Sequence, residues 1–317
     1  MRNYIIRRVL LMIPTLLLVT IIVFLSIRLM PGSVIDQLQD QLAGVGEIDR
    51  EELMHLLGLD MPIHVQYGRW IGNLVLHGDL GTSLRTQRAV AEGIAPRVPV
   101  SLELGLIGII VGLLIAIPVG VYSAIRQDTL GDYMGRSIAI GFISIPSFWI
   151  GTMVVVFPAI WWQWTPPVQY VPFAQNPIEN LGQFMIPGIV LGLVLSGTTM
   201  RMARTMMLEV LRQDYVRTAW AKGLTERTVV MRHALRNALI PVLTTMGLNV
   251  PIMIGGTVVI ETIFCLPGMG RYFLDALNKR DYTTVCGLNL VIACFVLVAN
   301  LLIDLSYAYL DPRIRYE

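Results

Sequence analysis

Long apolar runs separated by shorter polar segments dominate the pattern along this chain. A helix that crosses a bilayer needs about 20 consecutive apolar residues. Six stretches are long enough, at about 9–30, 100–124, 137–162, 184–206, 241–262 and 286–309. The pattern therefore predicts an all-α integral membrane protein with six transmembrane helices.

Composition supports this class, because 55% of the residues are hydrophobic and only 15% are charged, whereas soluble domains carry about 25% charged residues. The first apolar run follows Arg2, Arg7 and Arg8, as in a signal peptide. However, no small-residue cleavage site ends that run. We therefore expect it to remain as a membrane anchor.

The distribution of basic residues predicts the orientation, since cytoplasmic loops retain lysine and arginine. With the N-terminus inside, most basic residues fall in inner segments, whereas the outer loop 163–183 has none. Both termini are therefore predicted to be cytoplasmic. The balance of charge indicates no nucleic-acid partner.

The same pattern divides the chain into three parts. Residues 1–30 form the first transmembrane helix, 31–98 an extracytoplasmic segment, and 99–317 a five-helix core. Within residues 31–98 we expect a short helix at 50–58. The segment is either a cap over the helices or a docking surface for an external solute-carrying protein.

Residues 208–240 are unusually charged for this chain and predict a cytoplasmic hairpin of two helices. A first helix over 208–221 would stop at Gly223, which accepts a left-handed backbone. Thr225 would then cap a second helix, with Glu226 in its first turn.

Four apolar or aromatic residues of the first hairpin helix fall within one or two turns and are predicted to share a face. They are Tyr215, Val216, Ala219 and Trp220, with Arg212 and Arg217 turned away. A helix lying on lipid headgroups, with its arginines on phosphate, explains this spacing equally well.

Motifs for covalent chemistry are missing from the sequence. Lys222 and Lys279 are the only lysines, and neither lies in a phosphate-binding loop. The sequence has no G-x-S-x-G nucleophile elbow and no H-E-x-x-H zinc motif. Its cysteines and histidines lack metal-ligand spacing. We predict a chain without catalytic residues, metal or bound cofactor.

Asp304 is a charge inside the last apolar run, where it should face protein, water or a partner. The residues alone leave three functions open. They are a permease driven by a separate motor, an ion- or proton-coupled secondary transporter that uses Asp304, and a membrane scaffold or receptor that signals through the hairpin.

Tyr215–Pro241 resembles the cytoplasmic loop of ABC importer permeases, whose pattern is E-A-A-x-x-x-G followed by I-x-L-P. Arg217-Thr218-Ala219 stand at the E-A-A positions, and Ala219, Gly223 and Leu235 match the pattern. The stretch looks like the version in the dipeptide, oligopeptide and nickel branch. Further matches extend along nearly the whole chain, at 78–83, 97–104, 144–149, 266–270, 280–282 and 304–316.

This resemblance implies the type I importer permease architecture of a bacterial or archaeal cytoplasmic (inner) membrane, with this chain as the first of two permeases. The partners implied are a second homologous permease, two ATPase subunits that bind ATP and magnesium, and an extracytoplasmic solute-binding protein. The substrate implied above all is a dipeptide or oligopeptide, and the alternatives in the family are nickel chelates, glutathione-like molecules and oligosaccharides. The residues implied in contact with the ATPase are Tyr215, Arg217, Ala219, Trp220, Gly223 and Leu224.

Overall fold

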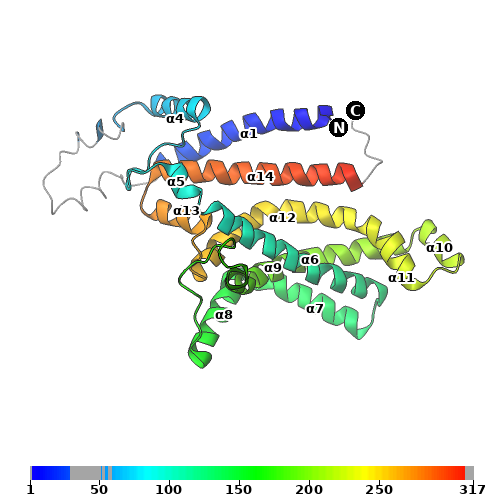
Figure 1. The fold of residues 1–317 in the computed structure, drawn as a ribbon. Coiled ribbons are helices and arrows are strands. Elements are labelled where there is room, and N and C mark those ends of the chain that lie inside the picture. The colour runs from blue at the N-terminus through cyan, green and yellow to red at the C-terminus, as the bar shows by residue number, and fades with distance from the viewer. Residues whose placement is uncertain (1, 29–50, 52–53, 56–58, 311–317) are drawn as a thin grey trace. The chain divides into compact units, whose positions relative to one another are not determined.

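The structure, a computed structural model, describes residues 2–28, 51, 54–55 and 59–310. Over these residues the regular secondary structure is helical, apart from an isolated antiparallel bridge between Thr82 and Ala89 (Figure 1). Its helices are α1 (Arg2–Arg28), α4 (Ile63–His77), α5 (Val90–Ile94), α6 (Val98–Ile125), α7 (Leu130–Ser144), α8 (Ser147–Trp162), α9 (Pro177–Leu211), α10 (Asp214–Ala221), α11 (Glu226–Thr228), the π-helix η1 (Val229–Ala234), α12 (Leu235–Ile263), α13 (Met269–Asn278) and α14 (Tyr282–Leu310). The helix expected at 50–58 lies outside the described residues, except for residues 51, 54 and 55.

Several of these helices are long and apolar enough to cross a membrane. Within the described residues there are 4 such spans, or up to 5 if a bent pair of helices counts as one. The 4 spans are Ile6–Ser26, Val90–Ile125, Pro177–Leu211 and Tyr282–Ile303. The predicted run 241–262 corresponds to α12, and the side chains of several of its residues lie outside the description. The chain is a helical, multi-pass membrane protein.

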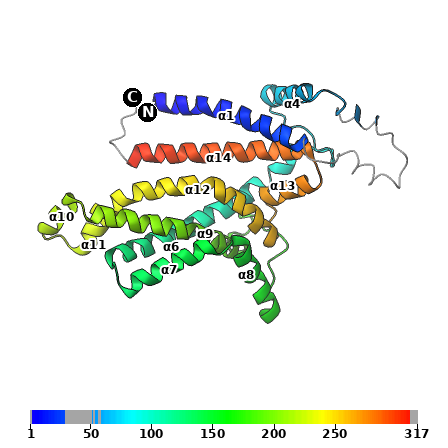
Figure 2. The same ribbon diagram turned by 180° about the vertical axis from the view of Figure 1, so that it is seen from behind.

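The predicted helix 137–162 is wrong as a single helix. The chain instead forms α7 and α8, which meet at 93°, and Figures 1 and 2 both show α8 leaving the direction of α7. The break falls at Ile145, with φ −91° and ψ 122°, and at Pro146, which precedes the first turn of α8. Proline disfavours helical backbone at the residue before it and cannot donate a backbone hydrogen bond, so α7 ends there.

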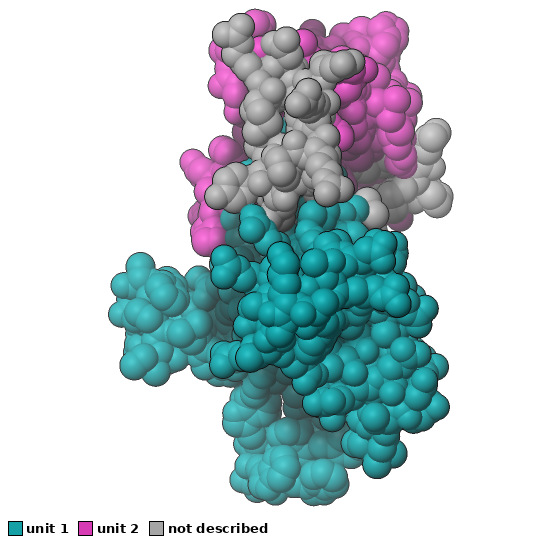
Figure 3. Space-filling model, turned by 90° about the vertical axis from the view of Figure 1, so that its right-hand side faces the viewer, with its two compact units in different colours: residues 1, 100–270, 298–317 teal, residues 2–99, 271–297 magenta. Residues whose placement is uncertain are grey.

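The chain separates into two compact units, coloured in Figure 3. Unit 1 contains residues 100–270 and 298–317 together with residue 1, and unit 2 contains residues 2–99 and 271–297.

In unit 1, α6 and α9 pack closely through small residues. A stripe on α6 recurs every fourth residue and is buried, comprising Leu104, Gly108, Gly112, Ala116, Gly120 and Ala124. Opposite it on α9 lie Gly188 and Gly192. A Cβ added at Gly192 would lie 2.8 Å from the Val111 side chain and 2.9 Å from the backbone oxygen of Gly108. Glycine at these positions lets the two backbones approach, as is common between membrane helices.

Buried apolar residues extend this contact to α12. The core cluster comprises Val100, Leu104, Phe184, Val190, Leu191, Leu195, Ile260, Phe264 and Leu266. Beside it the fully buried carboxylate of Glu261 accepts a hydrogen bond from Ser101 Oγ at 2.6 Å. The backbone N–H of Met269 donates to the same Ser101 Oγ at 2.8 Å. A buried carboxylate is tolerated when hydrogen bonds compensate its lost hydration, and this one links the ends of α6 and α12.

In unit 2, a buried aspartate connects the loop after α4 to the start of α14. Asp281 accepts hydrogen bonds from Ser83 Oγ at 2.5 Å, from the backbone N–H of Leu84 at 3.1 Å and from Thr284 Oγ1 at 2.8 Å. The α1 end of the unit is packed by Phe24, Tyr67 and Trp70, whose ring centroids lie 5.2–6.3 Å apart. These contacts hold α1, α4 and α14 as one unit.

We predict that Gly192→Ala lowers the thermal stability of the detergent-solubilised protein, by about 1–3 kcal/mol, because the added methyl group overpacks the α6–α9 contact. Gly182→Ala is the matched control on the same helix, since nothing lies within 4 Å of its Cβ position. That variant should be neutral, or more stable by up to about 1 kcal/mol through helix propensity. Equal melting temperatures for the two variants would contradict the close contact.

Candidate functional site

The charged segment between α9 and α12 folds as the predicted hairpin. Helix α10 ends at Ala221, and the chain turns at Gly223, whose φ is +75°. The backbone N–H of Gly223 donates to the oxygen of Trp220 at 2.9 Å, and that of Leu224 to the oxygen of Ala219 at 3.4 Å. The hairpin and the left-handed glycine are therefore confirmed. Only glycine adopts this conformation without strain.

The first arm of the hairpin is shorter than predicted, because residues 208–221 do not form one helix. Helix α9 ends at Leu211, and Gln213 is extended, with φ −73° and ψ 149°. A new helix then begins at Asp214, whose carboxylate favours the positive end of the helix dipole. This break separates α10 from the span and gives it its own direction.

The four residues predicted to share a face of α10 divide into two pairs. Val216 and Ala219 are buried, with 0% and 5% exposure, and pack against Val229. Tyr215 and Trp220 are 43% and 45% exposed. The prediction of one common face is wrong, because a helix packed on a single neighbour buries only a narrow stripe, here filled by the smaller side chains.

Ala219 therefore faces the interior of the hairpin and is not available to a partner's surface. Of the residues predicted to contact the ATPase, Tyr215, Arg217, Trp220 and Leu224 have exposed side chains, and Gly223 is exposed in the turn. The Tyr215 hydroxyl accepts a hydrogen bond from Asn237 Nδ2 at 2.8 Å. Arg217 Nη1 lies 3.7 Å from Asp214 Oδ1 in an exposed ion pair, which contributes little to stability.

Thr225 occupies the predicted position before the second arm, but its side chain does not cap that arm. Its hydroxyl instead lies 3.0 Å from the hydroxyl of Thr228. The second arm continues as α11, a π-helical stretch and α12, so it is continuous with a long apolar helix.

This second arm is fixed to the helices of unit 1 by an apolar cluster that sequence reasoning missed. Buried residues of η1 and the start of α12 pack against the ends of α6 and α9, comprising Val121, Ala124, Met207, Val230, Ala234 and Ala238. The first arm packs on η1 through Val216, Ala219 and Val229. Packed side chains therefore connect α10, through η1, with α6, α9 and α12.

A buried ion pair, which the sequence analysis also missed, holds the same end of these helices. Asp132 at the start of α7 is fully buried and receives two hydrogen bonds from Arg204 of α9, each 2.8 Å long. Ser123 of α6 also donates to Asp132. The sequence showed only that each of these charges lies near an apolar run. It could not show that they pair, because Asp132 and Arg204 are separated by 72 positions. A looser pair, Arg126–Glu226 at 3.8 Å, connects the α6–α7 loop with the hairpin.

Asp304 belongs to helix α14, but the structure does not describe its side chain. Its predicted role as an intramembrane charge therefore stays a prediction.

Two family matches together extend along nearly the whole chain. Residues 116–316 match the family described as binding-protein-dependent transport system inner membrane component, and residues 1–105 match the N-terminal component of such systems. The chain belongs to this family. It is therefore a transport permease, and the secondary carrier and the receptor are set aside. ATP hydrolysis in such a system belongs to a separate subunit.

Curated relatives agree over their full lengths. The chain is 37% identical to the dipeptide transport system permease protein DppB of Escherichia coli (strain K12) and 40% identical to the oligopeptide transport system permease protein AppB of Bacillus subtilis (strain 168). Each alignment covers 100% of both chains. A crystal structure of an amino acid ABC transporter with histidines is also similar. The match covers 71% of this chain and 94% of the chain in that structure, with a TM-score of 0.47 and 13% sequence identity.

We predict that Ala219→Arg opens the hairpin, because a guanidinium cannot be buried without a partner between Val216 and Val229. Hydrogen exchange of the α10 amides should accelerate roughly 30-fold, which corresponds to about 2 kcal/mol of local stability. Ala221→Arg is the matched control, since Ala221 is exposed on the same helix. Unchanged exchange in the Ala219 variant would contradict the packing of this arm.

Proposed function

We propose that this chain is the first permease of an importer for dipeptides or oligopeptides. The support is its full-length similarity to permeases of dipeptide and oligopeptide systems. The motifs at 78–83, 144–149 and 266–270, which resemble the same branch, agree with it. Nickel chelates are the alternative substrates within that branch.

In this proposal the chain crosses a bacterial or archaeal inner membrane six times, with α7 and α8 counted as one broken span. Both termini face the cytoplasm, and residues 31–98 lie outside as a segment beside the five-helix core of 99–317. A second homologous permease completes the translocation path. Two ATPase subunits bind ATP and magnesium below it, and a solute-binding protein delivers the substrate above.

The hairpin is the contact with the ATPase in this proposal. The observation that supports this role is two exposed aromatic side chains on a short helix that is itself packed on the bundle. Trp220, Tyr215 and Leu224 present apolar area, and aromatic anchors of this kind dominate many protein interfaces. Arg217 lies beside them as a charged group for the rim. Ala219 shapes the hairpin from inside, and Gly223 forms its exposed turn.

The coupling step follows from the packing. Closure of the ATPases on ATP moves α10, and the contacts of Val216 and Ala219 with Val229 carry that movement into η1. From η1 the Met207 and Val230 cluster passes it to α9 and α6. Packed interiors resist compression and transmit displacement, so the short α10 can act on long helices.

We predict that Trp220→Ala weakens copurification of the ATPase subunits and lowers ATP-dependent uptake of a labelled dipeptide into proteoliposomes about tenfold or more, as expected for removal of an interface hot spot. Trp162→Ala is the matched control, since Trp162 is 71% exposed at the end of α8, remote from the hairpin in sequence. Both variants should melt like the unaltered protein.

Normal ATPase recovery and normal uptake by the Trp220 variant would contradict the proposed contact between α10 and the ATPase. A separate outcome concerns the substrate. If the assembled importer moves a nickel chelate but no dipeptide or oligopeptide, the peptide assignment fails while the coupling assignment stands.

A further inference from the structure

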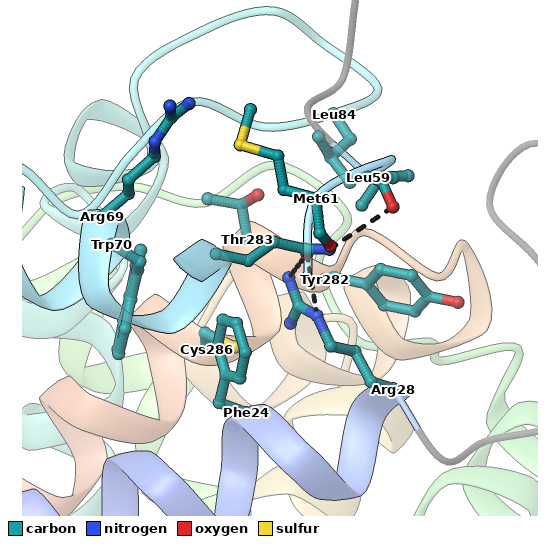
Figure 4. Close-up of a pocket in the computed structure, with 11 residues that line it drawn as sticks. Phe24, Arg28, Leu59, Met61, Arg69, Trp70, Leu84, Tyr282, Thr283 and Cys286 are labelled. Atoms are coloured by element: carbon teal, nitrogen blue, oxygen red, sulfur yellow. Dashed lines mark hydrogen bonds between the residues drawn. The ribbon is translucent and has the colours of Figure 1, made fainter. Parts of the chain in front are cut away.

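A cavity of about 240 Å³ opens in unit 2, beside the end of α1 (Figure 4). This volume holds far more than a single water. It is lined by residues of α1, α4, the loops before and after α4, and the start of α14, namely Phe24, Arg28, Leu59, Met61, Gln66, Arg69, Trp70, Leu84, Tyr282, Thr283 and Cys286. The Asp281 network described above holds the two segments that contribute Leu84 and Thr283.

The apolar span of α1 indicates where this cavity lies relative to the membrane. The apolar span in that helix ends at Ser26, so Arg28 follows just beyond it. Phe24, Tyr67 and Trp70 cluster there, and aromatic rings of this kind gather where the hydrocarbon meets the headgroups. The cavity therefore lies at the level of lipid headgroups, whichever leaflet this end of α1 faces.

The charge of the lining is one-sided. Among the residues that the structure describes, it contains two guanidinium groups, of Arg28 and Arg69, and no carboxylate. Figure 4 shows the Arg28 guanidinium turned toward the middle of the group and Arg69 at its edge. A partly buried cation among these described lining residues, none of them acidic, favours an anionic ligand.

Neutral contacts hold Arg28 in position for such a ligand. Its Nε and Nη2 donate to Gln66 Oε1 at 3.1 and 2.7 Å, and its guanidinium carbon lies 3.5 Å from the centre of the Phe24 ring. Gln66 is fixed in turn, since its Nε2 donates to the backbone oxygen of Met61 at 2.7 Å. These contacts leave other N–H groups of the guanidinium for a further acceptor, because arginine carries five donors.

We propose that this cavity binds the phosphate of an anionic glycerophospholipid from the surrounding leaflet. Arg28 binds the phosphate from inside the cavity, and Arg69 approaches it from the rim. Met61, Leu59 and Trp70 offer apolar surface to the glycerol and the upper acyl chains. Arginine pairs with phosphate through several charge-assisted hydrogen bonds, and basic pockets between membrane helices bind lipid headgroups in this way. The membrane itself supplies phosphate at this depth.

The test uses the full chain, purified with its partner subunits and placed in nanodiscs of phosphatidylcholine with a minor fraction of phosphatidylglycerol. Native mass spectrometry counts the phosphatidylglycerol retained after detergent release. We expect the unaltered protein to retain it and Arg69→Gln to retain about tenfold less, as for a lost charged hydrogen bond. Arg69 is exposed, so its replacement leaves the fold intact, and Arg28→Gln should show the larger loss.

Arg88→Gln is the matched control, since Arg88 is exposed in the same unit and does not line the cavity. It should retain phosphatidylglycerol as the unaltered protein does. Equal retention in all variants would overturn the proposal. Release of the lipid by excess inorganic phosphate would reassign the site to a soluble anion. Loss of the solute-binding protein from the arginine variants, with lipid retention unchanged, would reassign it to a protein contact.

Discussion

The close approach of α6 and α9 determines the geometry of unit 1. Two backbones meet where Gly108 and Gly112 face Gly188 and Gly192. A methyl group at Gly108, Gly188 or Gly192 would collide with a neighbouring side chain. Lipid chains are as apolar as leucine, so helices in a membrane gain little by burying large apolar residues against one another. Small residues compensate by allowing extensive van der Waals contact along the stripe.

The hairpin depends on that contact, because its second arm packs where α6 and α9 end together. Met207, Val121 and Val230 meet there, and the Asp132–Arg204 pair joins α7 to α9 at the same end of unit 1. Removing one partner of such a buried pair leaves an uncompensated charge. The pair therefore disfavours arrangements of these helices in which either charge loses its partner. The proposed contact of α10 with the ATPase needs a fixed base of this kind, since a flexible one would absorb displacement.

The division of α10 into a buried and an exposed stripe separates two roles that the sequence motif combines. Ala219 and Gly223 match the pattern of importer permeases. Here Ala219 is small because it packs against Val229, and Gly223 is glycine because its φ is +75°. Both requirements are internal to the hairpin. The larger side chains of Trp220 and Tyr215 are exposed beside them and are the ones proposed to contact the ATPase.

Local patterns in the sequence were sufficient for the helical membrane class, for the hairpin with its turn at Gly223, and for the resemblance to importer permeases. Each rests on residues near one another in the chain, whose hydrophobicity and backbone preference act locally. The tertiary structure alone decided the 93° angle between α7 and α8, the inward direction of Ala219, the Asp132–Arg204 pair and the cavity at Arg28. Pro146 explains where α7 ends, but the angle between α7 and α8 depends on packing against other helices. Contacts between positions far apart in the chain leave no periodic signal, so one sequence could not predict them.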